Sequence, residues 1–148
     1  MDINIRKIEN SEKEYIEIGC HKVTDRINDI VRFVKLRQGS IDAFREDRQY
    51  QIPVSDILYV ESVDDRTFIY LAGDCLESRR RLYEVEEMLP SQYFARISKS
   101  AVVNLMKITS VSPALNGRFL CLLRNGEKLM ISRKYVPGIR EKLKGESR

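Results

Sequence analysis

The feature that most constrains the fold of this chain is a series of short apolar runs that begins after Gly39. The runs are rich in β-branched and aromatic residues, and turn signals separate them. The pairs Asn116-Gly117 and Asn125-Gly126 are strong signals for tight turns, and the second lies between two runs as a hairpin requires. The predicted strands are Ile41–Phe44, Ile57–Val63, Thr67–Leu71, Val102–Asn104, Ile108–Val111, Phe119–Leu123 and Leu129–Ile131. This spacing predicts a mainly β, antiparallel domain rather than alternating β-α-β units.

Two short helices interrupt the β pattern. Apolar residues recur on one side of Ser78–Met88, and Pro90 follows this segment closely, which predicts a helix that stops there. A final helix is predicted from Tyr135 or Val136 to Lys144. The part of the chain after residue 40 is therefore an α+β domain in which strands predominate.

Residues 1–40 are predicted to form a separate β-β-α extension, followed by a second domain over residues 41–148. Isoleucines alternate with polar residues around Ile3–Ile8, and the alternation returns at Ile16–Cys20, which predicts two short strands. From Val23 onward, apolar residues recur at three and four residues, as in an amphipathic helix. The apolar stripe of this helix has two interpretations: it packs on its own two strands, or it forms a homodimer face.

Charge is distributed unevenly along the chain. Residues 89–148 hold 12 Lys and Arg against 3 Asp and Glu, whereas residues 41–88 hold 6 against 12. A folded domain with this asymmetry presents a positive surface formed by its last part. Such a surface attracts polyanions, and its binding weakens as salt is added.

Several functional classes are not expected. No apolar run reaches the roughly 20 residues that span a bilayer, and the first residues lack the apolar core of a secretion signal, so a cytoplasmic location is predicted. The cysteines Cys20, Cys75 and Cys121 have no paired spacing and are predicted to be reduced, buried thiols. With one histidine and no phosphate-loop or zinc motif, we expect no enzyme, cofactor, metal or small-molecule substrate.

The segment Phe94–Ile108 is the first candidate for nucleic-acid contact, because it interleaves apolar anchors with cationic and small polar residues. The cationic and polar residues are Arg96, Ser98, Lys99, Ser100, Asn104 and Lys107. Apolar anchors that fix a loop with such tips suit contact with the backbone and grooves of a nucleic acid. The alternative is an ordinary strand-turn-strand with a charged rim, and this segment alone leaves both open.

Two other places carry candidate side chains. A predicted strand end delivers Arg133 and Lys134 to the start of the last helix. Arginine reads guanine through two hydrogen bonds or grips phosphate, and helix-start amides favour phosphate as well. Arg66 follows the pair Asp64-Asp65, which is predicted to be a hairpin turn, and this position places it at a loop tip.

Together these residues resemble a known family, the LytTR DNA-binding domain of bacterial transcription regulators. The resemblance runs from about residue 45 to residue 144. Its motifs are Ile57-Leu-Tyr-Val-Glu-Ser62, Phe68-Ile-Tyr-Leu71, Phe94-Ala-Arg-Ile-Ser-Lys-Ser100, Val103-Asn104 and Ile131-Ser-Arg-Lys-Tyr135. The resemblance implies short antiparallel sheets whose loops enter successive major grooves of duplex DNA.

The resemblance also implies three contact regions. They are the loop at Asp65 and Arg66, the loop at residues 98–100, and the junction at residues 133–134. The acidic pair Asp64-Asp65 departs from what a DNA-contacting loop favours, which leaves Arg66 as its expected contact. Phosphate contacts are further expected from Lys107 and from lysines near the helix end.

The sequence therefore predicts a sequence-specific, double-stranded-DNA-binding transcription regulator that acts as a homodimer on repeated half-sites. About 40 residues before the domain are too few for a receiver domain. The chain thus resembles the stand-alone members of the family, some of which a neighbouring membrane protein controls. The alternative function is a protein-interaction module whose basic face binds an acidic partner. RNA binding is disfavoured, because the chain has only 12 aromatic residues and no tryptophan.

Overall fold

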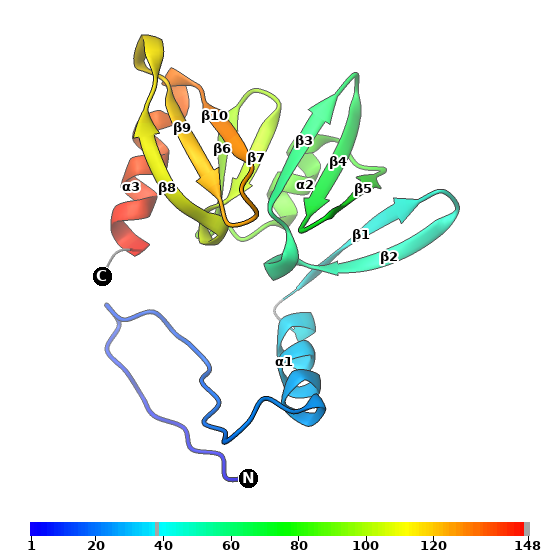
Figure 1. Cartoon of the computed structure of the whole chain (residues 1–148), viewed down its shortest axis with the longest axis vertical. Coiled ribbons are helices and arrows are strands. Elements are labelled where there is room, and N and C mark those ends of the chain that lie inside the picture. Colours follow the sequence, from blue (N-terminus) through cyan, green and yellow to red (C-terminus); the bar gives the residue numbers. More distant parts are fainter. Residues whose placement is uncertain (38, 147–148) are drawn as a thin grey trace.

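The computed structural model describes residues 1–37 and 39–146 (Figure 1). Within these residues, strands form two antiparallel sheets, and α1 (Asp25–Arg37), α2 (Leu82–Met88) and α3 (Val136–Glu146) accompany them. The prediction of a mainly β, antiparallel domain with two short helices is confirmed. No helix in the described part of the chain is long and apolar enough to cross a membrane.

The larger sheet has seven strands in the order β2-β1-β5-β4-β3-β7-β6. They are β1 (Ser40–Arg45), β2 (Arg48–Pro53), β3 (Tyr59–Val63), β4 (Arg66–Leu71), β5 (Asp74–Ser78), β6 (Phe94–Ser98) and β7 (Ala101–Asn104). The smaller sheet has the order β10-β9-β8, from β8 (Ile108–Pro113), β9 (Phe119–Leu123) and β10 (Lys128–Ile131). Each predicted strand after Gly39 is present, with ends that shift by up to two residues.

Two apolar clusters hold these layers together. Leu82 and Val85 of α2 are buried in the first cluster, with Val60, Ile69 and other residues of the large sheet. The second cluster joins the β6–β7 end of that sheet to the small sheet and to α3. Each large aliphatic side chain removed from water contributes about 1.5–3 kcal/mol. The first cluster therefore fixes α2 on the large sheet, and the second fixes the small sheet and α3 against β6.

A polar contact adds to this connection between the sheets. The Tyr59 hydroxyl of β3 donates to the Glu127 carboxylate in the β9–β10 turn at 2.7 Å. The Tyr59 ring also stacks on Tyr70 of β4, with 4.3 Å between ring centroids. Burial, and then the hydrogen bond to the Glu127 carboxylate, raise the pKa of Tyr59 above its ordinary value. The hydroxyl therefore stays protonated and keeps donating across the boundary between the sheets.

Asn104 has a structural position, which corrects its interpretation as a group available to phosphate or bases. Its side chain is buried at the end of β7. The amide nitrogen donates to the Ile57 carbonyl at 2.8 Å, and the amide oxygen accepts from the Met106 backbone at 3.0 Å. In the sequence, Asn104 is a polar residue among apolar ones. That pattern is equally typical of a buried side chain that forms hydrogen bonds within the protein.

The cysteine prediction is only partly right. Cys121 is buried, and burial raises the pKa of its thiol to about 11. Cys20 and Cys75 are exposed, because Cys20 lies in the extended N-terminal segment and Cys75 lies on β5 with its side chain on the solvent side. All three are free thiols in the structure.

The N-terminal extension is not a β-β-α unit. The helix α1 is present, but residues 3–8 and 16–20 form no strand, and Ile3 and Ile5 are 88% and 97% exposed. Two short strands without a third strand or a covering layer are marginal in water, so the alternating pattern alone is not enough. Figure 1 shows this segment as an extended loop beside α1, and its Lys13 ammonium lies 4.3 Å from the centre of the Tyr93 ring, just before β6.

Candidate nucleic-acid interface

Two hairpin turns of the large sheet lie side by side at one end. In the β3–β4 turn, Asp64 and Asp65 both take positive φ angles of 52° and 63°, which aspartate tolerates in a two-residue hairpin. The β6–β7 turn is Lys99-Ser100. Because Glu61 of β3 pairs with Ala101 of β7, the two turns reach the same end of the sheet. The Ser62 amide donates to the Ser100 carbonyl at 2.8 Å and joins them.

The small sheet brings two more connections to this end. The Ser132 amide, between β10 and α3, donates to the Ile97 carbonyl of β6 at 2.7 Å. The stem of Arg133 then crosses the β8–β9 turn: a Cβ atom built on Gly117 would lie 2.8 Å from Arg133 Cδ. We call these four connections the upper edge, since they lie at the top of Figure 1. The upper edge comprises residues 64–65, 99–100, 116–117 and 132–134.

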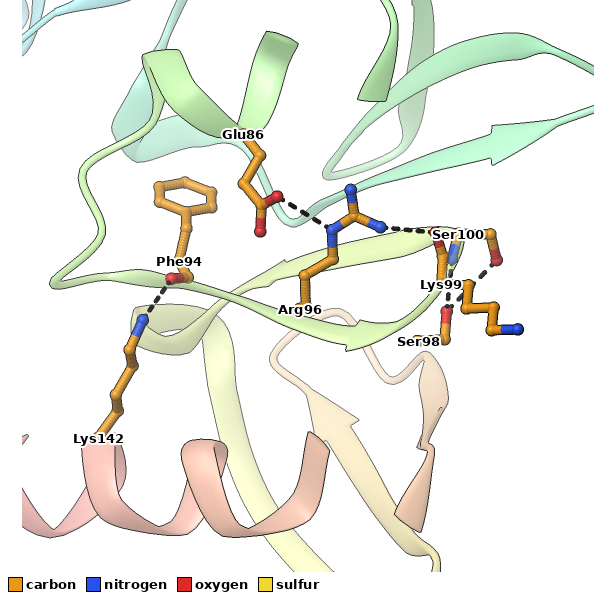
Figure 2. Close-up of polar contacts among 7 residues, drawn as sticks. All are labelled: Glu86, Phe94, Arg96, Ser98, Lys99, Ser100 and Lys142. Atoms are coloured by element: carbon orange, nitrogen blue, oxygen red, sulfur yellow. Dashed lines mark hydrogen bonds and ion pairs between the residues drawn. The ribbon is translucent and has the colours of Figure 1, made fainter. Parts of the chain in front are cut away.

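Most of the predicted site residues lie together on or beside the upper edge. Lys99, Ser100, Arg133 and Lys134 are exposed, and Ser98 is half-buried at the end of β6. Figure 2 shows the Lys99 side chain extending away from its turn. Neither Lys99 nor Arg133 forms an ion pair with any residue that the structure describes. Their charges are therefore available to an external anion.

Arg66 is placed differently. It begins β4 directly after the acidic turn, but its guanidinium is turned toward Glu77 of the neighbouring strand β5. Its Nε donates to one Glu77 oxygen at 2.7 Å and a terminal nitrogen donates to the other at 3.2 Å. The side chain is 65% exposed, so this pair is a surface ion pair of about 0–1 kcal/mol. Arg66 thus stands at the margin of the upper edge with its charge partly neutralised.

Lys107 does not lie on the upper edge. It follows Asn104 at the far end of β7, and its carbonyl accepts from the Arg124 amide of the β9–β10 turn at 2.9 Å. Lys142, one of the lysines near the end of α3, donates to the Ser91 and Phe94 carbonyls at 2.7 and 3.1 Å, before and at the start of β6. Both residues therefore belong to the opposite, lower end of the sheets (Figure 1).

Sequence reasoning missed the β8–β9 turn as a candidate contact. Asn116 is exposed at its tip, and Arg118 follows with its Nε donating to the Leu115 carbonyl at 3.1 Å. The Asn116-Gly117 pair predicted a turn correctly, since Asn116 and Gly117 have φ angles of 61° and 74°. Its place beside Arg133 depends on how the two sheets pack, and the local sequence carries no signal for that.

A shallow hollow of about 250 Å³ indents the large sheet below the upper edge. Lys99 and Asp65 line it from the two turns, and Arg81 lines it from the start of α2. Lys99 and Arg81 therefore lie on the same hollow as Asp65, which lowers the electrostatic cost of bringing a polyanion toward it.

The fold and this edge define a class: β-rich domains of two antiparallel sheets that present a row of loops at one end. The model of the LytTr DNA-binding domain matches residues 47–144. A solved LytTr DNA-binding domain, from a Bacillus cereus protein described as a methyl-accepting/DNA response regulator, superposes with a TM-score of 0.66 at 27% identity. The alignment covers 70% of this chain and 95% of that domain.

Relatives of similar length exist in Staphylococcus aureus. Uncharacterized HTH-type transcriptional regulators of strains NCTC 8325 and COL are each 28% identical over 145 residues, 97% of this chain and 98% of theirs. In the described part of this chain, strands separate all three α helices, so no helix-turn-helix is formed. With two thirds of its length matched, the chain belongs to the LytTr DNA-binding domain family.

Proposed function

We propose that this protein is a transcription regulator that binds specific double-stranded DNA sequences through its upper edge. The observation that carries the proposal is the convergence of Lys99 and Arg133 at one end of the molecule, both exposed and neither in an ion pair with a residue that the structure describes. Membership of the LytTr DNA-binding domain family supports the same ligand.

Within the upper edge, each side chain has a role that suits its chemistry. Lys99 and Arg133 reach base edges in major grooves, where both residue types recognise guanine. Lys134, Ser98 and Ser100 contact phosphate oxygens and set the position of the protein on the duplex. Arg66, at the margin and partly neutralised by Glu77, makes at most a phosphate contact.

The test is selection of binding sites from random duplex DNA with the full-length protein, followed by affinity measurements on the enriched sequence. At physiological salt, specific DNA is bound about 10³-fold or more tightly than random DNA by proteins of this kind. An enriched sequence bound no better than random DNA would end the proposal. Binding to an acidic protein in place of DNA would support the protein-interaction alternative.

Lys99 and Lys107 provide a matched pair of variants, since each loses one positive charge at opposite ends of β7. Lys99→Ala is expected to weaken specific binding by about 1–3 kcal/mol, because a base or phosphate contact is lost. Lys107→Ala is expected to leave the specificity ratio and the salt dependence of binding unchanged. Fluorescence anisotropy titrations at several salt concentrations measure both. Equal effects of the two variants would show that net charge, not the upper edge, controls binding.

We propose further that a second copy of the chain covers the N-terminal segment. The isoleucines Ile3, Ile5 and Ile16 are between 67% and 97% exposed and alternate with polar residues. Exposed apolar clusters of this kind mark association surfaces. Pairing with a second copy supplies the neighbouring strands that each segment lacks in a single chain. A dimer then places two upper edges on two half-sites.

Sedimentation velocity of the full-length protein tests the dimer. The double variant Ile5→Asp and Ile16→Asp is expected to be monomeric, because a buried unpaired carboxylate opposes the contact. It should bind a single half-site as the wild type does but lose cooperative binding to two half-sites. A wild-type protein that stays monomeric at micromolar concentrations would rule out this part of the proposal.

A further inference from the structure

Arg96 connects the Lys99-Ser100 turn of the upper edge to helix α2. Its side chain leaves β6 on the side of α2 and is only 23% exposed. Nε donates to the Glu86 carboxylate at 3.1 Å, and a terminal nitrogen donates to the Lys99 carbonyl at 2.6 Å. Figure 2 shows this single guanidinium between the helix and the turn.

The turn that receives this hydrogen bond has an irregular backbone. The pairing of β6 with β7 shifts register between Arg96 and Ser98, so the chain enters the turn through a bulge. Ser98 Oγ accepts from the Ser100 amide at 3.1 Å and supports the turn from within. Arg96 supports it from the other side, through a charge-assisted hydrogen bond that is stronger than a neutral one. The direction in which Lys99 points therefore depends on where the guanidinium is held.

Arg96 is poorly placed to bind DNA itself. Two of its donors are engaged within the molecule, and its charge is balanced by Glu86. Its side chain is largely covered, whereas the Lys99 side chain extends away from the turn (Figure 2). Arg96 therefore acts indirectly, through the Lys99-Ser100 turn that it holds.

We infer that Arg96, anchored by Glu86, is a positioning residue that sets the conformation of the Lys99-Ser100 turn for reading DNA. The inference rests on the proposed function and deepens it: α2 then contributes to sequence specificity without touching the duplex. A turn held in one conformation before binding loses less conformational entropy when it docks, and it discriminates better between bases.

The variant Glu86→Gln tests this inference, because the positioning role and simple electrostatics predict changes of opposite sign in the affinity for the selected DNA. The change removes a negative charge, which by itself strengthens binding to any DNA. If Glu86 holds Arg96 in place, affinity for the selected DNA instead falls about 3- to 10-fold, because a glutamine amide oxygen holds the guanidinium more weakly than a carboxylate does, while affinity for random DNA stays equal or rises. Glu87→Gln is the matched control, because Glu87 is the next residue on α2, is exposed and loses the same charge.

Arg96→Lys is a second variant that keeps the charge. A lysine ammonium cannot reproduce the planar fork that joins Glu86 and the Lys99 carbonyl. We expect the same loss of the specific-to-random affinity ratio, an unchanged salt dependence, and shifted NMR amide signals at Lys99 and Ser100. A salt dependence reduced by one phosphate contact would overturn the inference, since Arg96 would then be touching DNA.

The outcomes separate this inference from the function on which it rests. Wild-type protein that does not distinguish selected from random DNA contradicts the proposed function itself. If the wild type distinguishes them and Glu86→Gln behaves as Glu87→Gln does, only the positioning role of Arg96 is overturned. Loss of specificity in Glu86→Gln and Arg96→Lys, with no further loss when the two changes are combined, supports it, because both act through one contact.

Discussion

An Asn104→Ala variant is expected to have a free energy of unfolding about 2–4 kcal/mol lower than the wild type, since a buried carbonyl and a part-buried backbone amide lose their partners. These groups are the Ile57 carbonyl, 2.8 Å from the Asn104 amide nitrogen, and the Met106 amide, 3.0 Å from its oxygen. They join β7 to the segment before β3 and start the turn toward β8. Urea denaturation followed by circular dichroism measures the change.

Asn125 is the matched control for this prediction. It makes the same pair of contacts, accepting from the Glu127 amide at 3.1 Å and donating to the Glu127 carboxylate at 2.8 Å. Asn125 is exposed, however, so water replaces both hydrogen bonds after substitution by alanine. Its loss is expected to stay below about 1 kcal/mol. Equal losses for the two variants would mean that burial does not determine the cost at Asn104.

Three strands are absent from the predicted set: β2 and β5, which are mostly polar, and β6, which belongs to the segment whose interpretation as a strand was left open. β5 contains Leu76 as its one buried large apolar residue, and β2 contains Ile52. Both are strands because neighbouring strands pair with them: β5 lies between β1 and β4. Pairing of this kind overrides weak local preference, and a local pattern cannot express it.

The N-terminal segment shows the converse case. Alternation at Ile3 and Ile5 was strong enough to predict a strand, but within residues 1–37 and 39–146 neither side chain is covered by a neighbouring strand or a packed layer. A periodic pattern states which side of a strand is apolar. It does not supply the partner that makes the strand stable.

Only part of the candidate site could be predicted, because a local pattern does not show which residues the fold brings together. Lys99 and Lys107 are close in sequence and carry the same charge, yet β7 lies between them and carries them to opposite ends of the sheet. Lys99 and Arg133 are far apart in sequence, and the hydrogen bond between Ser132 and Ile97 brings their loops together. Residue type identified the cations, whereas strand direction and packing between the sheets decide which of them face the same ligand.

Arg133 and Lys99 are the residues whose removal should weaken specific DNA binding most. Arg133→Ala is expected to lose about 1–3 kcal/mol of specific affinity, about 5- to 150-fold, because an arginine fork that contacts one base pair has no substitute. Anisotropy titrations with the selected DNA measure the loss. Arg124→Ala is the control, since Arg124 is exposed in the β9–β10 turn at the lower end. A loss no greater than that of Arg124→Ala would remove Arg133 from the interface.

Gly117 tests the same contact without changing any charge. A methyl group at Gly117 would lie 2.8 Å from Arg133 Cδ, so Gly117→Ala should displace the arginine stem and lower specific affinity. The substitution also strains the backbone, because φ is +74°, at a cost of roughly 1–2 kcal/mol.

Gly126→Ala carries similar strain at φ +90° but has no atom within 4 Å of the new methyl group. Both variants should therefore be destabilised, and only Gly117→Ala should lose discrimination between selected and random DNA. The same loss in Gly126→Ala would mean that strain in the small sheet, rather than the place of Arg133, governs recognition.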